Sequence, residues 1–521
     1  MRIWNIVYLG VFLTIGPGFG QPGTQQLSAG AAARFLDQAT WGPTPASIAA
    51  LQQMGIGNWL NAQFALNTSD IPDQPLLGSS GQPNRNIHSV QAAFFQTTVT
   101  GQDQLRQRVA FALSQIWVVS MSGNSIAYAY PPYWRIFRDN AFGNYRDLIQ
   151  AVTLSPAMGR YLNMANNDKG NPAKNTSANE NYARELMQLF TLGLTQLNPD
   201  GTPVLDSNKN PVPTYEQTVV TNMAKLLTGW TYPTAPGATP KKNNPPYFFG
   251  PMFAVESEHD TSAKTIFSGV TIPAGQTAEQ DLDSLLDALM AQPTMAPFVS
   301  EQLIEHLVTS NPSPQYISRV SNIFKDDGTG VTGNLQAVIA AILTDPEARA
   351  DDQSTAVSTA NFGHMREPAL FVSNLLRGLN ATLAPASTVY ANSSELGEDV
   401  FNAPSVFSYF SPQYRIEGGL LGPEFQIYST QTAADRADIV SALVYGTIDK
   451  ATTVNLTPFV QQAGSTASLL NIINSTFLHG SMSPALEEAA TDAVEAAPTP
   501  IAKAQAALYV VLSSGEYQII H

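Results

Sequence analysis

The pattern of hydrophobic positions predicts a mainly α-helical protein. Apolar residues recur every three or four positions over most of the chain, which is the spacing of one face of an α-helix. Pro45 and Gly55 stand where one such stretch would begin and end. We therefore expect one large multi-helix domain over residues 27–521, with small β-hairpin insertions and long irregular loops. The predicted helices include residues 102–120, 216–230, 276–292, 295–309, 313–324, 334–343, 483–497 and 501–513.

Two stretches break the helical pattern. Residues 198–214 contain two turn signals around short apolar pairs and predict a β-hairpin insertion. Residues 231–275 form the longest region without helical periodicity and are rich in Pro, Gly and aromatic residues. Long irregular stretches in compact proteins are often functional, so this second stretch is a candidate part of a site.

The N-terminal residues 1–20 are typical of a secretory signal peptide. Arg2 precedes an apolar run from Ile3 to Ile15, and a turn-prone Pro17-Gly18 follows. A membrane anchor is the alternative, but the run is short for a membrane span. No later stretch is long and apolar enough to cross a bilayer. We therefore expect a periplasmic or extracellular protein that is not an integral membrane protein once the signal peptide is removed.

Composition excludes several classes of protein. The net charge is −15 and no run of Lys or Arg occurs, so nucleic acid is not an expected partner. The absence of cysteine rules out disulfides, thiolate metal sites, iron–sulfur clusters and a cysteine nucleophile. Neither a Gly-x-Ser-x-Gly elbow nor a phosphate-binding glycine loop is present. The sequence therefore predicts no cofactor.

A dense polar cluster lies at the start of a predicted helix over residues 179–190. Glu180 is four residues from Arg184, so the two side chains can pair on one face. Glu180 and Glu185 point about 140° apart on a helix and cannot form a facing catalytic pair by themselves. A general acid–base site would need a second carboxylate from elsewhere, such as Asp260 or Glu367. The alternative is structural, with Glu180 capping the helix and Arg184 tying it to a neighbouring loop.

Other polar and aromatic residues suggest binding. Neutral amides beside aromatic faces are what a sugar-binding cleft requires, although the same rings could only anchor the long loops to the helical body. Since His259 has no second histidine nearby, we predict no metal site. The candidate catalytic residues are Glu180, Glu185, Asp260 and Glu367. The candidate substrate-binding residues are Asn163, Asn167, Asn179, Asn181, Arg184, Trp230, His259, His364 and Arg366.

Short motifs occur from end to end, at residues 34–44, 105–108, 179–186, 227–230, 259–260 with 264–265, 366–368, 404–407, 507–509 and 516–518. Together they resemble one bacterial family, the domain of unknown function DUF1800. Many members of that family carry a Trp-His pair where this chain has Ile116-Trp117, and His where it has Phe190, so a metal site based on those histidines does not carry over. The resemblance implies one large, mostly helical exported domain and no established activity.

Two hypotheses of function remain open. The first is an exported hydrolase that acts on a polysaccharide through a carboxylate pair, with a glycan or another neutral polymer as partner. The second is a non-catalytic exported binding or assembly protein, in which the polar cluster is a structural ion-pair network. The two hypotheses differ in the expected environment of the carboxylates, which face a cleft in the first and form internal ion pairs in the second.

Overall fold

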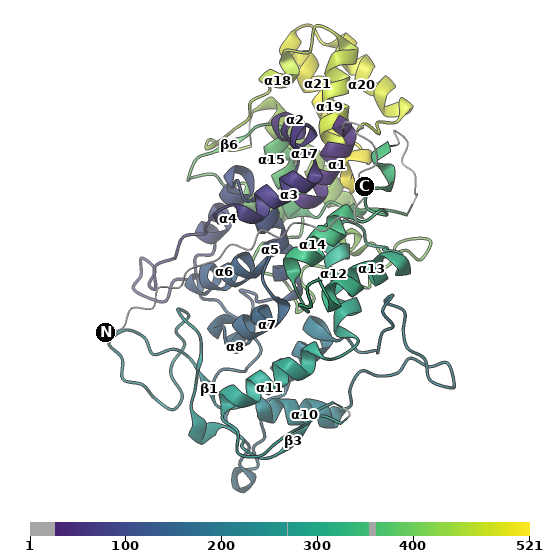
Figure 1. Cartoon of the computed structure of the whole chain (residues 1–521). Helices are drawn as coiled ribbons and strands as arrows, with labels where there is room; N and C mark the ends of the chain where they lie inside the picture. Colours follow the sequence, from purple (N-terminus) through teal and green to yellow (C-terminus); the bar gives the residue numbers. More distant parts are fainter. Residues whose placement is uncertain (1–26, 268, 354–360, 447) are drawn as a thin grey trace.

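The computed structural model describes residues 27–267, 269–353, 361–446 and 448–521, and the predicted signal peptide over residues 1–20 lies outside them. It confirms a mainly α-helical single domain (Figure 1). The helices are α1 (Ala29–Ala39), α2 (Pro45–Met54), α3 (Ile56–Ala65), α4 (His88–Thr100), α5 (Gln104–Ile116), α6 (Tyr130–Asn140), α7 (Tyr145–Thr153), α8 (Pro156–Tyr161), α9 (Asn181–Glu185), α10 (Gln217–Leu226), α11 (Ala278–Met290), α12 (Met295–Leu307), α13 (Pro314–Lys325), α14 (Leu335–Thr344), α15 (Pro368–Gly378), α16 (Tyr390–Glu395), α17 (Thr430–Tyr445), α18 (Thr457–Val460), α19 (Thr466–Phe477), α20 (Pro484–Ala496) and α21 (Pro500–Leu512).

The described strands are two residues long and form four antiparallel pairs, β1–β2, β3–β4, β5–β8 and β6–β7. The β5–β8 pair joins the middle of the chain to its C-terminal end. The strands are β1 (Trp230–Thr231), β2 (Phe253–Ala254), β3 (Lys264–Thr265), β4 (Thr271–Ile272), β5 (His364–Met365), β6 (Thr382–Leu383), β7 (Thr452–Thr453) and β8 (Ile519–Ile520).

Local capping explains where many helices begin. The Thr44 and Ser47 side chains form a reciprocal capping box, and Pro45 occupies the first helical position of α2. Thr277 and Gln280 do the same for α11. Because these signals are local, the helix starts could be predicted from the sequence.

The predicted hairpin is a three-segment antiparallel arm over residues 194–214, which extends from the body at the right of Figure 1. Its first turn lies against the body at Gly201. A Cβ there would come within 2.9 Å of Ile317 on α13 and 3.6 Å of the Glu301 carboxylate on α12. With φ of +80°, this position suits glycine both by conformation and by space.

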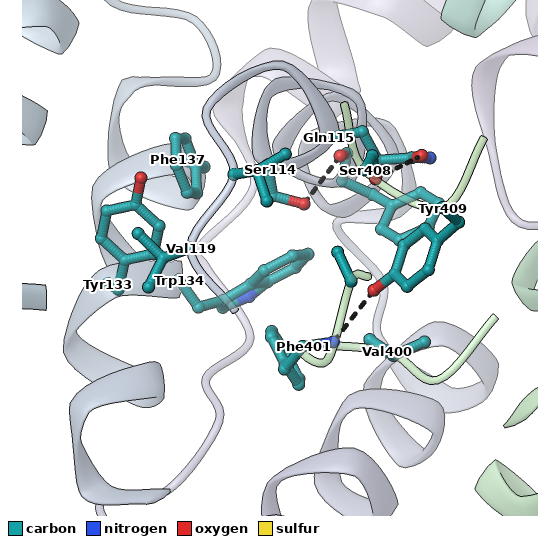
Figure 2. Close-up of a pocket in the computed structure, with 13 residues that line it drawn as sticks. Ser114, Gln115, Val119, Tyr133, Trp134, Phe137, Val400, Phe401, Ser408 and Tyr409 are labelled. Atoms are coloured by element: carbon teal, nitrogen blue, oxygen red, sulfur yellow. Dashed lines mark hydrogen bonds between the residues drawn. The ribbon is translucent and has the colours of Figure 1, made fainter. Parts of the chain in front are cut away.

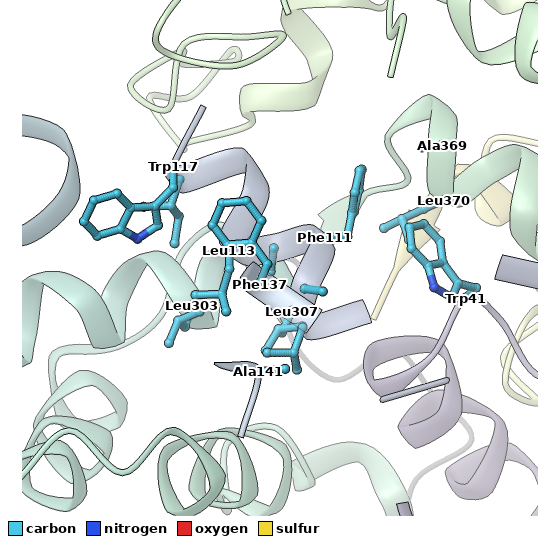
Figure 3. Packing of buried hydrophobic residues seen from close by; sticks show 14 of the residues in the cluster. Trp41, Phe111, Leu113, Trp117, Phe137, Ala141, Leu303, Leu307, Ala369 and Leu370 are labelled. Atoms are coloured by element: carbon cyan, nitrogen blue, oxygen red, sulfur yellow. The ribbon is translucent and has the colours of Figure 1, made fainter. Parts of the chain in front are cut away.

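The centre of the hydrophobic core is α5. Its Phe111 and Leu113 pack with Leu303 and Leu307 of α12 and with Leu370 of α15 in one buried cluster (Figure 3). The same helix also buries Arg108 and Gln115. Because α5 is buried nearly all round although it carries several polar residues, those polar residues need partners.

A buried polar network ties the two ends of the chain together. Asp37 on α1 pairs with Arg366, which follows β5, and accepts hydrogen bonds from Asn374 (2.7 Å) and His479 (2.9 Å). Burial opposes the charge of Asp37, but Arg366 and His479 outweigh that effect and lower its pKa to about 2. Arg366 also donates to the backbone carbonyl of Tyr517 near the C-terminus. The network therefore fixes the segment that precedes α15.

In the described part of the chain, no helix is long and apolar enough to span a bilayer.

We predict that Asp37→Asn lowers the free energy of unfolding by about 3–5 kcal/mol, because it leaves the Arg366 guanidinium buried without its counter-charge. Urea unfolding at neutral pH measures the change. The matched control is Glu488→Gln on the exposed face of α20, which should stay within about 0.5 kcal/mol of the parent. A loss below about 1 kcal/mol in Asp37→Asn would contradict the role given to this pair.

Candidate functional site

The polar cluster begins a very short helix. The α-helix α9 has five residues and continues as a π-helix over Leu186–Thr191. Glu180 stands at the N-cap, but its side chain makes no capping hydrogen bond, so the expectation that it caps the helix is wrong. Its carboxylate instead accepts from Arg184 (3.0 Å), Gln217 (2.8 Å) and Thr221 (2.8 Å). The start of this helix is therefore connected to a neighbouring segment, as expected, and that segment is α10.

The amide-rich candidates lie together. The Asn181 side chain donates to Asn163 (2.8 Å), and Asn167 exchanges two hydrogen bonds with the backbone of Asn179. Asn163 has φ of 60°, a left-handed conformation that Asn tolerates better than most residues. Trp230 follows Gly229, whose N–H donates to the Asn167 carbonyl, and is itself buried. These five candidates share one loop region, mostly through backbone contacts.

Glu185 differs from Glu180. Burial raises the pKa of Glu185, and Arg184 only partly offsets this. Its Oε2 is buried and has no hydrogen-bond partner among the described residues. Leu189, one turn further along the π-helix, lines the cavity described below. Glu185 therefore lies one turn from that cavity.

His259 and Asp260 have separate environments. The His259 ring is fully buried, with Nδ1 3.0 Å from the Thr228 carbonyl and Nε2 3.0 Å from Asp281, which also pairs with Lys264 (2.6 Å). Burial opposes ionisation of Asp260, but hydrogen bonds from Ser262 lower its pKa. These contacts anchor the long loop on α11, and they leave His259 no access to a substrate.

The remaining candidates, His364, Arg366 and Glu367, belong to a second assembly deep in the core. The Glu367 carboxylate accepts a hydrogen bond from Gln115 (2.7 Å). Burial raises the pKa of Glu367 to about 7, although Arg108 and the Gln115 hydrogen bond favour the charged form. No hydrogen bond in the described ranges joins Glu367 to Glu180, Glu185 or Asp260. The structure therefore divides the predicted candidates between two regions.

A cavity of about 80 Å³ opens on the second assembly. It lies between α12, the 3₁₀ helix Pro423–Ile427 and the loop that follows Ala403. Its walls are part apolar and part neutral-polar, with two carboxylates. The lining residues are Gln115, Ile116, Leu189, Gln302, Glu305, His306, Ser310, Val406, Phe407, Ser408, Phe410, Pro412, Pro423 and Glu424.

The two cavity carboxylates, Glu305 and Glu424, have unequal environments. Burial raises the pKa of Glu305 well above its usual range, and the charges of Glu301 and Glu424 raise it further. The distance from Glu424 Oε1 to His364 Nδ1 is 3.2 Å. The other oxygen of Glu424, Oε2, is buried and has no hydrogen-bond partner among the described residues. Glu305 is thus disposed to hold a proton beside a histidine-bound carboxylate, which is a pattern typical of functional sites.

Among the described lining residues the one basic side chain, His306, is neutral at pH 7. Burial lowers the pKa of His306 to about 3, with Arg108 and His364 acting in the same direction. The Arg108 guanidinium is fully buried behind His306 and donates to the His306 carbonyl. The described lining of the cavity includes no lysine or arginine, so its ionisable side chains other than His306 are the acidic Glu305 and Glu424.

Two residues near the cavity have a left-handed backbone conformation. Ser408 lines the cavity with φ of 64°, and Phe401 has φ of 68°, which is rare for a bulky residue. Figure 2 shows both beside a smaller apolar cavity of about 30 Å³, where the Phe401 N–H donates to the Tyr409 hydroxyl (3.1 Å) and the Ser408 hydroxyl donates to Gln115 (3.3 Å). Strained backbone and π-helices both cluster at functional sites. Gln115 and Ser408 line both cavities.

Sequence reasoning missed Glu305, Glu424 and Gln115. A usable signal was the pair Glu301 and Glu305, because two like charges four residues apart on one helix are unfavourable and need a reason in a chain so poor in charge. Glu424 and Gln115 carried no local signal, since only the tertiary fold brings them to the cavity.

The two positions at which the family resemblance implies histidines in relatives are in contact here. The Trp117 and Phe190 rings stack with centroids 4.4 Å apart. Within the described ranges, no three His, Asp or Glu side chains are grouped so as to hold a metal ion.

The fold and site define a mainly α-helical protein with a buried ionisable cluster beside an acidic cavity. The family model described as "Protein of unknown function (DUF1800)" matches residues 34–519, and the chain therefore belongs to this family, as the motifs indicated. No curated protein and no solved structure matches the chain.

We predict that Glu367→Gln makes stability less dependent on pH. The folded pKa of Glu367 is raised to about 7, so its contribution to stability is full below about pH 4.5 and is lost as the pH rises through about 7. The variant keeps an acceptor for Gln115 but does not titrate. Relative to the parent, it should gain about 2–4 kcal/mol between pH 4.5 and 8, measured by urea unfolding. A difference in free energy of unfolding between variant and parent that stays constant with pH would contradict the raised pKa of Glu367.

Proposed function

We propose that the protein is an exported hydrolase that cleaves a polysaccharide in the cavity lined by Glu305 and Glu424. The observation that carries the proposal is the presence of two unequal carboxylates in one cavity, one with a strongly raised pKa and one held by a histidine. Glycoside hydrolysis requires one carboxyl group that gives a proton to the leaving oxygen. A second carboxylate either accepts a proton from the attacking water or itself attacks the sugar carbon.

The chemistry assigned to the pair is acid–base hydrolysis. Glu305 gives its proton to the glycosidic oxygen as the bond from that oxygen to the sugar carbon breaks. A water molecule bonds to the same carbon and gives a proton to Glu424. His364, 3.2 Å from Glu424, orients that carboxylate. One water is consumed, and both carboxyl groups recover their starting states after proton exchange with solvent.

The walls of the cavity support a sugar as substrate. Phe407 is 45% exposed at the cavity and offers a face for C–H stacking. Gln115, Gln302 and Ser310 offer uncharged hydrogen-bonding groups. Aromatic faces with neutral hydrogen-bonding groups are typical of ligand sites for sugars.

The polar cluster around α9 has a supporting role in this proposal. Asn163, Asn181 and Arg184 are exposed or half-buried and can contact a long substrate outside the cavity. Glu180 is engaged by three side chains, and this observation favours the structural interpretation for Glu180 itself. It is also the observation that favours the second candidate function, a non-catalytic binding or assembly protein. Export rests on the N-terminal sequence over residues 1–20.

We predict that Glu305→Gln and Glu424→Gln each lower the hydrolysis rate by about 10²–10⁴-fold, which is the usual contribution of general acid–base catalysis. The measurement is reducing-sugar release from a panel of purified polysaccharides, with thermal unfolding to verify the fold. Glu488→Gln on α20 is the matched control and should keep full activity. No release from any polysaccharide by the parent, or full activity in either cavity variant, would remove the proposal.

A further inference from the structure

We propose that the cavity between Glu305 and Glu424 binds a protonated amino group, so that the substrate is a polysaccharide of sugars with free amines. This inference rests on the proposed function, because it names the substrate class of the same cavity. It differs from the neutral polymer that composition alone suggested.

The first argument is the charge of the cavity. Glu305 and Glu424 line it, and Glu301 lies one turn before Glu305 on α12. His306 stays neutral, since burial lowers its pKa to about 3. None of the described lining residues is a lysine or arginine. A positively charged group would therefore be attracted to Glu424 and would favour ionisation of Glu305, and a carboxylated sugar would be repelled by Glu424.

The second argument is an unused acceptor. Glu424 is only 7% exposed, and its Oε2 has no partner in the described part of the chain, although its Oε1 contacts His364. A buried carboxylate oxygen without a donor costs free energy, and a ligand N–H would remove that cost. An ammonium group presents three such donors.

The third argument is the aromatic wall. Phe407 and Phe410 line the cavity that holds the carboxylates. Aromatic faces next to carboxylates are a common environment for ligand cations, because the ring faces carry negative partial charge. An acetylated amine is uncharged, so it would contact the ring surface but would not be attracted to the carboxylates.

The net charge of the whole molecule also favours a cationic polymer. The net charge of −15 draws a cationic polymer toward the protein over a distance that a neutral polymer does not feel. Within the cavity, a bound ammonium would favour the ionised form of Glu305 by opposite charge and so lower the pKa that burial raises.

The test is calorimetric titration of the mature chain, at neutral pH and low salt, with glucosamine oligomers and with N-acetylglucosamine oligomers of equal length. We expect the amine form to bind at least tenfold more tightly, and added salt to remove most of that preference. Proton release on binding, seen as a dependence of the heat on the buffer, should accompany only the amine form.

Variants locate the site. Glu424→Gln should weaken binding of the amine oligomer at least tenfold, and Glu488→Gln on α20 should leave it unchanged. Phe407→Ala, at an exposed position that does not threaten the fold, should weaken it about two- to fivefold. Equal binding of the two oligomers, or unchanged affinity in both Glu424→Gln and Phe407→Ala, would overturn the inference.

The two proposals fail in different ways. Amine-selective binding without hydrolysis would remove the proposed function and keep the ammonium site. Hydrolysis of a neutral glycan without amine-selective binding would remove the ammonium site and keep the hydrolase.

Discussion

The ion pair between Asp37 and Arg366 is the interaction on which the rest of the structure depends. It brings together α1, the segment before α15, the second residue after α19 and the last residues of the chain. Arg436 of α17 adds to it by donating to the Arg366 carbonyl (2.8 Å) and to Gln518 (2.6 Å). A buried pair of this kind is costly to desolvate, and loss of either partner would leave the other charge buried without compensation. It therefore makes the two ends of the chain interdependent.

That constraint also positions the candidate site. His364 and Glu367 flank Arg366 in sequence, so the segment held by Asp37 and β8 carries both of them. His364 reaches Glu424 on one side, and Glu367 reaches Gln115 of the central helix α5 on the other. The cavity is lined by α5, the π-helix, α12 and residues 406–424, next to the segment that the network holds. A site built on such a rigid frame can hold its side chains in place.

Sequence reasoning succeeded where the controlling interactions are local. Helices such as α11, α12 and α13 follow from hydrophobic spacing and capping residues, and the arm over residues 194–214 follows from its turn signals. The site depends on long-range contacts and was reached only in part, through His364, Arg366 and Glu367. Glu424 lies in a short 3₁₀ helix with no distinctive neighbours. Glu305 falls on the polar side of an ordinary amphipathic helix, and only the fold turns that side toward a cavity.

The buried carboxyl groups in and around the cavity lower the free energy of unfolding, and groups that are retained at such a cost favour a functional role. Burial raises the pKa values of Glu301, Glu305, Glu367 and Glu398, so the folded chain favours the neutral form of four carboxyl groups that ionise freely when unfolded. Apolar residues of the same size would pack without that cost. The strained φ angle of Ser408 and the π-helix over Leu186–Thr191 add to the cost in the same place. Because α5 and its neighbours supply a large apolar core, the fold tolerates this concentration of unfavourable terms, and a ligand that brings positive charge into the cavity would favour the ionised form of Glu305.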